Sequence, residues 1–491
     1  MWFLAFFAHR HLDFRIAEVE SLVKLCGVEG QLQWKKPEGD HEHSPFYYFD
    51  LPSEEVAKKV AGRSILLKGL YEVWGSGHTV EEVEAGIRAY PEERKAPFLG
   101  EDVSFKVVVD GFGKAFTMEE QLQKMERFAF IPWKGPVRMK DPDVRFWIID
   151  SLGGYDPLGL PPLQDRIIFF GREIGASERG VLGKYDLKKR RYIGPTSMDA
   201  EISFLMANQG LARPGSLVFD PFCGTGSCLI PAAHFGALTL GADIDIRVVK
   251  YGKRGHTIWS NFEQYGLTAP VAILRADNHQ QPWRNDIRET FHAIVCDPPY
   301  GVRAGGRKSG GKKLLSGKAE PYVLTEQQKD GHIPSTAPYT LAECLHDLLD
   351  LAARTLVIGG RLVFFVPCSV PDYDPKQLPT HPILRLVANS EQLLTRKFSR
   401  RLLTMQKTGP YTDELAAAAA ETSREFRERH VEIVEQSRNE EIKALLCSSK
   451  RGEEDGNEVE VANGDDGEDG DVPVTEGGVR DELRTYRAKW C

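Results

Sequence analysis

The sequence lacks several features that would assign it to common protein classes. No apolar run is long enough to span a membrane, which argues against a membrane protein. The eight cysteines are scattered without a CxxC pair, so we predict neither a disulfide framework nor a zinc site, but reduced thiols in a cytoplasmic protein. A GxGxxG fingerprint and a Gly-Lys-Ser/Thr phosphate loop are also missing, which disfavours a pyrophosphate cofactor.

Basic residues are missing from one stretch near the end of the chain. Residues 452–472 hold ten acidic side chains and no basic one, and the rest of the chain carries 63 basic and 61 acidic residues. We therefore predict an acidic, largely disordered tail over 449–491, preceded by a charged helix over 411–448. At 491 residues, the chain is long enough for two or three domains.

Two small α+β units are predicted before residue 176. In the first, over 1–75, strands at 2–8, 46–49 and 65–73 accompany helices at 14–26 and 53–61. The apolar start of the chain lacks the basic residues of a signal peptide, so we expect a buried first strand. The second unit, over 76–175, has strands at 103–109, 145–149 and 166–170 and a helix at 118–128. A basic connector over 176–195 follows.

From residue 196 to 410 helices alternate with apolar strands, which predicts a parallel sheet. The expected strands lie at 217–219, 238–241, 271–274, 293–296, 361–366, 383–387 and 401–405. An apolar helix over 341–356 is expected to end at Gly359-Gly360.

Acidic side chains follow four of these strands, and the carboxyl ends of parallel strands are where such sheets bind ligands. Asp220 precedes a loop in which Gly224 and Gly226 allow the backbone close to a ligand. Asp243 is placed to bind ribose hydroxyls, and Asp277 to accept a hydrogen bond from an adenine amine. Without phosphate-binding features, this pattern predicts S-adenosylmethionine as the cofactor.

The fourth acidic residue, Asp297, begins the stretch Asp-Pro-Pro-Tyr-Gly. Asp297 and the carbonyl of Pro298 can accept the two hydrogens of an exocyclic amine, and Tyr300 can stack on an extruded base. The alternative interpretation is a rigid turn after a strand.

The motifs DPFCGTGS, GADID, AD and DPPYG, in this order, resemble those of amino-methylating S-adenosylmethionine-dependent methyltransferases. With the upstream YIGPTSMD and the two α+β units, which look like a ferredoxin-like unit and a THUMP RNA-binding domain, the chain resembles the eukaryotic tRNA guanine-10 N2-methyltransferase catalytic subunits. The resemblance implies a Rossmann-like seven-stranded methyltransferase sheet and methylation of a guanine N2 amine in tRNA. It also implies a heterodimer with a small zinc-binding activator subunit.

The resemblance also assigns site residues. The cofactor-binding positions are Thr196, Asp220, Phe222, Gly224, Gly226, Asp243, Ile244 and Asp277, and the catalytic ones are Asp297, Pro298 and Tyr300. For Thr196 and its neighbour Ser197, helix capping is the alternative role.

Basic residues gather in two places that suit RNA phosphates. They are Arg303, Arg307, Lys308, Lys312 and Lys313 in the glycine-rich loop after the Asp-Pro-Pro-Tyr stretch, and Lys188, Lys189 and Arg190 in the connector. Ordinary solvated charge is the alternative. Three other functions stay open at this point: adenine N6 methylation, protein glutamine methylation, and a tRNA-binding scaffold without activity.

Overall fold

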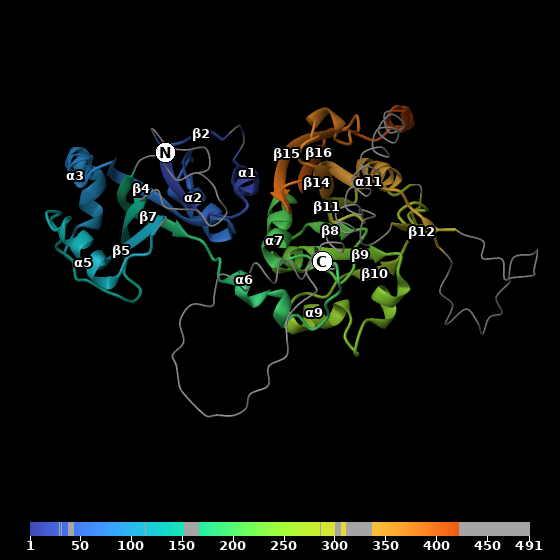
Figure 1. The fold of residues 1–491 in the computed structure, drawn as a ribbon, viewed down its shortest axis with the longest axis horizontal. Coiled ribbons are helices and arrows are strands. Elements are labelled where there is room, and N and C mark those ends of the chain that lie inside the picture. Colours follow the sequence, from blue (N-terminus) through green and yellow to red (C-terminus); the bar gives the residue numbers. More distant parts are fainter. Residues whose placement is uncertain are drawn as a thin grey trace, which may run out of the picture. The chain divides into compact units, whose positions relative to one another are not determined.

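The chain divides at residues 435 and 436 into a first unit, Met1–Glu435, and the remainder of the chain. The computed structural model describes part of the first unit (Figure 1): residues 1–28, 30, 32–37, 44–112, 114–151, 166–284, 286–299, 306–310 and 336–421. The predicted acidic tail lies outside these residues. Within them, no helix is long and apolar enough to cross a membrane.

The first seven strands form one sheet in the order β2-β3-β1-β4-β7-β6-β5. All neighbours are antiparallel except β5 and β6. The two predicted α+β units are joined in this sheet, because β4 pairs with β7 from Gly69 to Gly77, and the predicted boundary at residue 75 falls inside β4. The strands are β1 (Trp2–Phe7), β2 (Trp34–Lys35), β3 (Phe46–Asp50), β4 (Leu67–Gly77), β5 (Phe105–Phe112), β6 (Val144–Ser151) and β7 (Ile167–Ala176).

Helices accompany this sheet, and several begin at caps visible in the sequence. The side chain of Ser53 accepts a hydrogen bond from Val56 N, and Thr79 and Thr117 form capping boxes with Glu82 and Glu120. The helices are α1 (Arg15–Leu25), α2 (Glu54–Arg63), α3 (Val80–Ala89), α4 (Glu92–Lys95) and α5 (Met118–Glu126). Strand β1 is buried from Phe3 to Phe7 between β3 and β4, which confirms the prediction of a buried first strand.

The second seven-stranded sheet has the order β10-β9-β8-β11-β14-β16-β15. Its first five strands are parallel, whereas β16 runs antiparallel to both β14 and β15. The predicted α/β class with a seven-stranded C-terminal sheet is therefore confirmed. The strands are β8 (Leu217–Asp220), β9 (Leu238–Asp243), β10 (Ala272–Arg275), β11 (Phe291–Cys296), β14 (Leu356–Ser369), β15 (Leu384–Leu393) and β16 (Phe398–Lys407).

Short helices connect these strands, and a two-stranded ribbon follows β11. The helical elements are α6 (Val181–Lys184), η3 (Leu187–Lys189), α7 (Ala200–Gln209), α8 (Leu229–His234), the π-helix η4 (Arg247–Tyr251), α9 (Ile258–Tyr265) and α11 (Leu341–Thr355), and the ribbon is β12 (Arg307–Ser309) with β13 (Thr336–Pro338). Of the charged helix predicted over 411–448, residues 413–421 are helical, 411 and 412 precede the helix, and 422–448 lie outside the described residues.

The predicted end of α11 is wrong. The helix stops at Thr355, and Leu356 already begins β14, so Gly359 and Gly360 lie in the strand. Gly359 has a φ of +84°, and a Cβ on Gly360 would lie 3.0 Å from the carbonyl oxygen of His292. The glycines thus permit the register shift between β14 and β11 rather than a helix cap.

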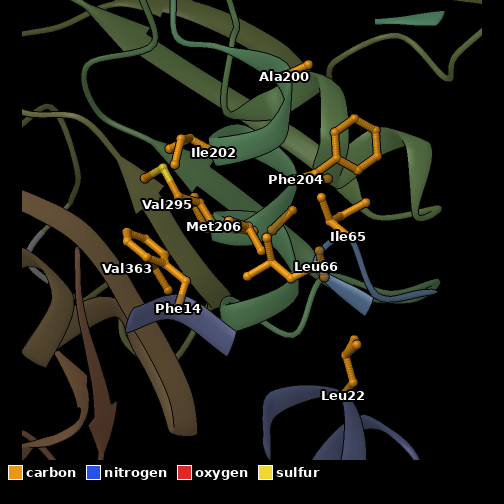
Figure 2. Close-up of a cluster of buried hydrophobic side chains, with 14 of the residues drawn as sticks. Phe14, Leu22, Ile65, Leu66, Ala200, Ile202, Phe204, Met206, Val295 and Val363 are labelled. Carbon is orange, nitrogen blue, oxygen red and sulfur yellow. The ribbon is translucent and has the colours of Figure 1, made fainter. Parts of the chain in front are cut away.

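Helix α7 is buried on every side, as expected for a helix that packs at the centre of a core. It joins the two sheets: Figure 2 shows Phe14, Leu22, Ile65 and Leu66 from the N-terminal part in one apolar cluster with residues of α7 and the second sheet. A buried carboxylate completes this junction. Glu18 accepts hydrogen bonds from Ser64 Oγ, Ile65 N, Leu66 N and Asn208 Nδ2, and burial raises its pKa.

Candidate active site

Four aspartates lie at one edge of the second sheet. Asp220, Asp243, Asp277 and Asp297 stand at or just after the ends of β8, β9, β10 and β11. These four strands are parallel neighbours in the sheet, so their carboxyl ends meet at the same edge. The predicted acidic edge is therefore present.

The glycine loop after β8 is held by two of these aspartates. Asp220 accepts a hydrogen bond from Phe222 N (2.9 Å), and Asp243 Oδ2 accepts one from Gly224 N (3.0 Å). Gly224 and Gly226 have φ of +49° and +84°, which is the left-handed region that glycine adopts at little cost. A Cβ on Gly226 would also lie 3.1 Å from Ile258 Cγ2, so a side chain there would have to displace Ile258.

Burial separates the roles of these carboxylates. Asp220 is 1% exposed, and burial together with the nearby Asp243 and Asp297 raises its pKa well above the ordinary range. Asp220 therefore stabilises the glycine loop from the protein interior. Asp243 is less enclosed and accepts a second amide, from Asp245 N at 2.9 Å, while burial raises its pKa. Asp277 accepts hydrogen bonds from His279 N (2.9 Å) and Ser309 N (2.6 Å).

The remaining predicted cofactor positions border this loop. Phe222 and Ile244 are half-buried beside it, and Thr196 is exposed. Ser197 Oγ lies 2.7 Å from Thr225 Oγ1 and accepts from Gly194 N, which ties the upstream segment to the glycine loop. The alternative that Thr196 and Ser197 cap a helix is wrong, because Asp199 caps α7.

The two carboxylate oxygens of Asp297 lie in different surroundings. Oδ2 lies 3.3 Å from Arg400 Nη1, whereas Oδ1 is buried and has no hydrogen-bond partner among the described residues. Burial raises the pKa of Asp297 to about 6, against the opposing charge and hydrogen bond of Arg400. The side chain as a whole is 25% exposed, although Oδ1 itself is covered. Pro298 is buried next to it, and Tyr300 lies outside the described residues.

The predicted RNA-binding cations have different surroundings. Lys188, Lys189 and Arg307 are exposed, while Lys308 pairs with Glu343 at 2.9 Å. Arg190 departs from the expectation of a surface cation: it is 5% exposed and donates to Ser227 Oγ, so its guanidinium stabilises the glycine loop. Arg303, Lys312 and Lys313 lie outside the described residues.

Sequence reasoning missed a second group of cations beside the connector. Arg247, Lys250, Lys253 and Arg254 are all exposed, and no acidic residue occurs from 246 to 262, although Arg247 pairs with Asp245 at 2.7 Å. The hydroxyl of Tyr192 donates to Val248 O (3.3 Å), which joins this segment to the connector. The run of positive charge was a signal that could have identified it. Arg400 gave no such signal, because only the fold brings it to Asp297.

The fold and this site define the class of the protein, a methyltransferase with an additional α+β part at its N-terminus. Residues 188–319 match the family model described as RMKL-like, methyltransferase domain, and residues 1–179 match the Tmrp11 THUMP N-terminal domain.

Among the described residues, no group of three or more His, Cys, Asp and Glu side chains could hold a metal ion.

Curated relatives identify the family within this class. The tRNA (guanine(10)-N(2))-methyltransferase TRMT11 of Rattus norvegicus is 38% identical over 82% of this chain and 87% of its own length. The proteins of that name from Homo sapiens and Dictyostelium discoideum are 37% and 35% identical, over 82% and 84% of this chain and 88% and 83% of their own lengths. The chain belongs to this family, which confirms the resemblance drawn from the sequence motifs.

Among solved structures, TrmN from Thermus thermophilus matches 83% of this chain and 100% of that chain, with 19% identity and a TM-score of 0.39. The family assignment rests on the curated relatives and not on this likeness.

Proposed function

We propose that this chain transfers the methyl group of S-adenosylmethionine to the exocyclic N2 amine of a guanine, at position 10 of tRNA. The observation that carries the proposal is Asp297, whose Oδ1 is an unpartnered acceptor at the edge that also holds Asp220, Asp243 and Asp277. The substrate follows from membership in the family, whose curated members are named for that nucleotide.

The residues at the sheet edge fit S-adenosylmethionine. The carboxylates of Asp243 and Asp277 each accept two backbone amides, which leaves further lone pairs for ribose hydroxyls at Asp243 and for an adenine amine at Asp277. Ile244 offers an apolar surface to the purine, and the glycine loop, with no side chain at Gly226, allows close approach. Thr196 lies beside the loop as a contact for the methionine end. When bound, this cofactor supplies an electrophilic methyl group.

The catalytic residues orient the amine that receives this group. The lone pair of a guanine amine is delocalised into the ring, so the amine is a poor nucleophile unless it is held. Asp297 Oδ1 and the carbonyl of Pro298 accept its two hydrogens, and such positioning supplies up to about 7–11 kcal/mol when it is complete. With a pKa of about 6, the carboxyl of Asp297 is mostly ionised at neutral pH and can act as an acceptor. Tyr300 remains the predicted stacking partner of the base.

Replacing Asp297 by asparagine or alanine tests this function. We expect methyl transfer to tRNA to fall at least about 100-fold, because the amine is no longer oriented, while calorimetry shows cofactor binding close to that of the unsubstituted protein. The control is Asp286→Asn, since Asp286 is an exposed surface residue paired with Arg284. Mass mapping of the methylated nucleoside separates guanine N2 from adenine N6. Transfer by Asp297→Ala at the rate of the unsubstituted protein contradicts the proposal.

The activator subunit is also part of the proposal. Both β10 and β15 are edge strands of the second sheet, but β15 is contacted by α1 and by the turn at Leu12–Phe14, and Glu391 N donates to Asp13. The edge of β10 is the better candidate to receive a strand of a small zinc-binding activator, and Val271 beside it is 61% exposed. A proline at Ile273 is expected to abolish co-purification of such a subunit; unchanged co-purification excludes this edge. We place the heterodimer in the cytoplasm.

A further inference from the structure

Arg400 is held by three contacts at the catalytic edge. Its Nη1 lies 3.3 Å from Asp297 Oδ2, its Nε donates to Gln392 Oε1 at 2.7 Å, and its guanidinium lies 3.9 Å from the ring centre of Phe365. Arg400 is 8% exposed, so these contacts and not solvent determine its position. The carboxylate oxygen that it does not touch, Asp297 Oδ1, is the one without a partner.

Among the residues that the structure describes, Arg400 is the cation that lies beside the Asp297 carboxylate. The other ionisable groups that face this carboxyl are Asp220 at the end of β8 and the buried thiols of Cys228 and Cys296. Burial opposes ionisation of Asp297 and raises its pKa. The charge and hydrogen bond of Arg400 favour the ionised carboxylate and lower the pKa of Asp297.

We propose that Arg400 is a positioning residue for methyl transfer, which holds Oδ2 of Asp297 so that Oδ1 accepts a hydrogen from the incoming amine. The inference rests on the proposed role of Asp297. It adds the residue that keeps the Asp297 carboxylate able to accept a hydrogen bond from the amine. A protonated Asp297 would carry a hydroxyl in place of one acceptor oxygen. Without the contact to Arg400, the carboxylate would rotate away from the amine. Arg400 itself touches neither the amine nor the methyl group.

The test compares the pH dependence of kcat/KM in Arg400→Gln, Arg400→Lys and the unsubstituted chain. Loss of a nearby opposite charge moves a carboxyl pKa by about 1–3 units, so we expect the acid limb of Arg400→Gln to shift upward by at least about one unit. A shift of one unit lowers the ionised fraction at pH 7 about twofold and a shift of two units about tenfold, so the rate at pH 7 should fall by about 2- to 10-fold and recover at pH 9. Arg400→Lys retains the charge and should restore the acid limb of the unsubstituted chain.

A neighbouring arginine serves as the matched control. Arg401 lies next in β16 but pairs with Asn389 and Glu391 and packs on Tyr373, away from Asp297. Arg401→Gln should leave the acid limb in place. If Arg400→Gln fails to fold, the isosteric Gln392→Glu adds a negative charge that competes for the same guanidinium, and it should shift the acid limb in the same direction.

The outcomes separate this inference from the proposed function. A rate loss in Arg400→Gln that is equal at every pH, with cofactor binding retained, means that Arg400 acts by packing and overturns the inference. An unshifted acid limb in Gln392→Glu overturns it too. Activity retained in Asp297→Asn would instead overturn the role of Asp297 itself.

Discussion

At the scale of single residues, the four strand-end aspartates show how burial divides similar side chains. Asp220 is fully enclosed and holds the turn of the glycine loop, while Asp297 is 25% exposed and keeps one oxygen without a partner. The sequence places all four at strand ends, but it does not separate a supporting carboxylate from one that faces a ligand. That separation depends on which atoms pack above each strand end.

Gly226 allows a prediction at this scale. Alanine at a φ of +84° costs about 1–2 kcal/mol, and its Cβ would lie 3.1 Å from Ile258 Cγ2. We expect Gly226→Ala to lower the free energy of unfolding by about that amount and to weaken cofactor binding about tenfold, which is ~1.4 kcal/mol, in calorimetry. Gly215 has a φ of +80° with nothing within 4 Å, so Gly215→Ala should lose similar stability and no cofactor affinity. Equal cofactor affinities of the two variants contradict the role of Gly226.

At the scale of elements, hydrogen bonds link the connector to the π-helix η4, and we call the exposed cations of these two segments and of the residues just after η4 the basic surface. Gln264 of α9 donates to Lys189 O and accepts from Arg191 N, so α9 fixes the connector. Tyr192 then links the connector to η4 through Val248. The exposed members of this basic surface are Lys188, Lys189, Arg247, Lys250, Lys253 and Arg254. Its position beside the cofactor edge suits the sugar–phosphate backbone of a tRNA whose base enters the site.

The basic surface is tested by replacing its four missed cations together. Glutamine at Arg247, Lys250, Lys253 and Arg254 should weaken tRNA binding and reduce the slope of log affinity against log salt by about 0.7–0.9 for each lost phosphate contact. Fluorescence anisotropy over a salt series measures both, and cofactor binding should not change. The control is Arg284→Gln, an exposed arginine outside the connector and η4. An unchanged slope in the fourfold variant removes this surface from the tRNA site.

At the scale of the whole molecule, charged residues join the N-terminal part to the methyltransferase sheet. Glu201 of α7 is 4% exposed and lies within 3.5 Å of Arg10, His11 and Arg179. Arg63 adds to this junction by donating to Asn208 Oδ1 and to Ala212 O. The two sheets are therefore connected by buried polar contacts as well as by the apolar cluster around α7.

This junction predicts a pH dependence of stability. Burial opposes ionisation of Glu201, but the hydrogen bond and charge of His11 and the charges of Arg10 and Arg179 outweigh it and lower the pKa to about 2. A carboxyl whose pKa is lower in the folded state stabilises the fold above its unfolded pKa of about 4.3, and this stabilisation is lost as pH falls toward about 2.

We expect Glu201→Gln to be less stable by about 2 kcal/mol at pH 6, with a smaller difference at pH 3.5, in urea unfolding. Glu263→Gln, in α9 outside the junction, is the control. A difference that does not shrink on acidification would show that Glu201 acts through packing alone.

The sequence by itself determined the local features of this protein. Apolar runs predicted the strands of the second sheet, and the aspartates and glycines at their ends predicted the cofactor edge, because period and turn chemistry are properties of neighbouring residues. The family was also recognisable from those motifs. The sequence did not reveal that β4 and β7 join the two N-terminal units into one sheet.

Only the tertiary structure decided which side chains meet. Arg400 and Asp297 are 103 residues apart, and they come together because β16 lies antiparallel beside β14, which pairs with β11. Arg190 was predicted as a surface cation, but the glycine loop packs over it. Gly359-Gly360 was predicted as a helix cap, but both glycines lie in β14, where the register against β11 shifts. Such pairings depend on strand order and burial, which no local pattern records.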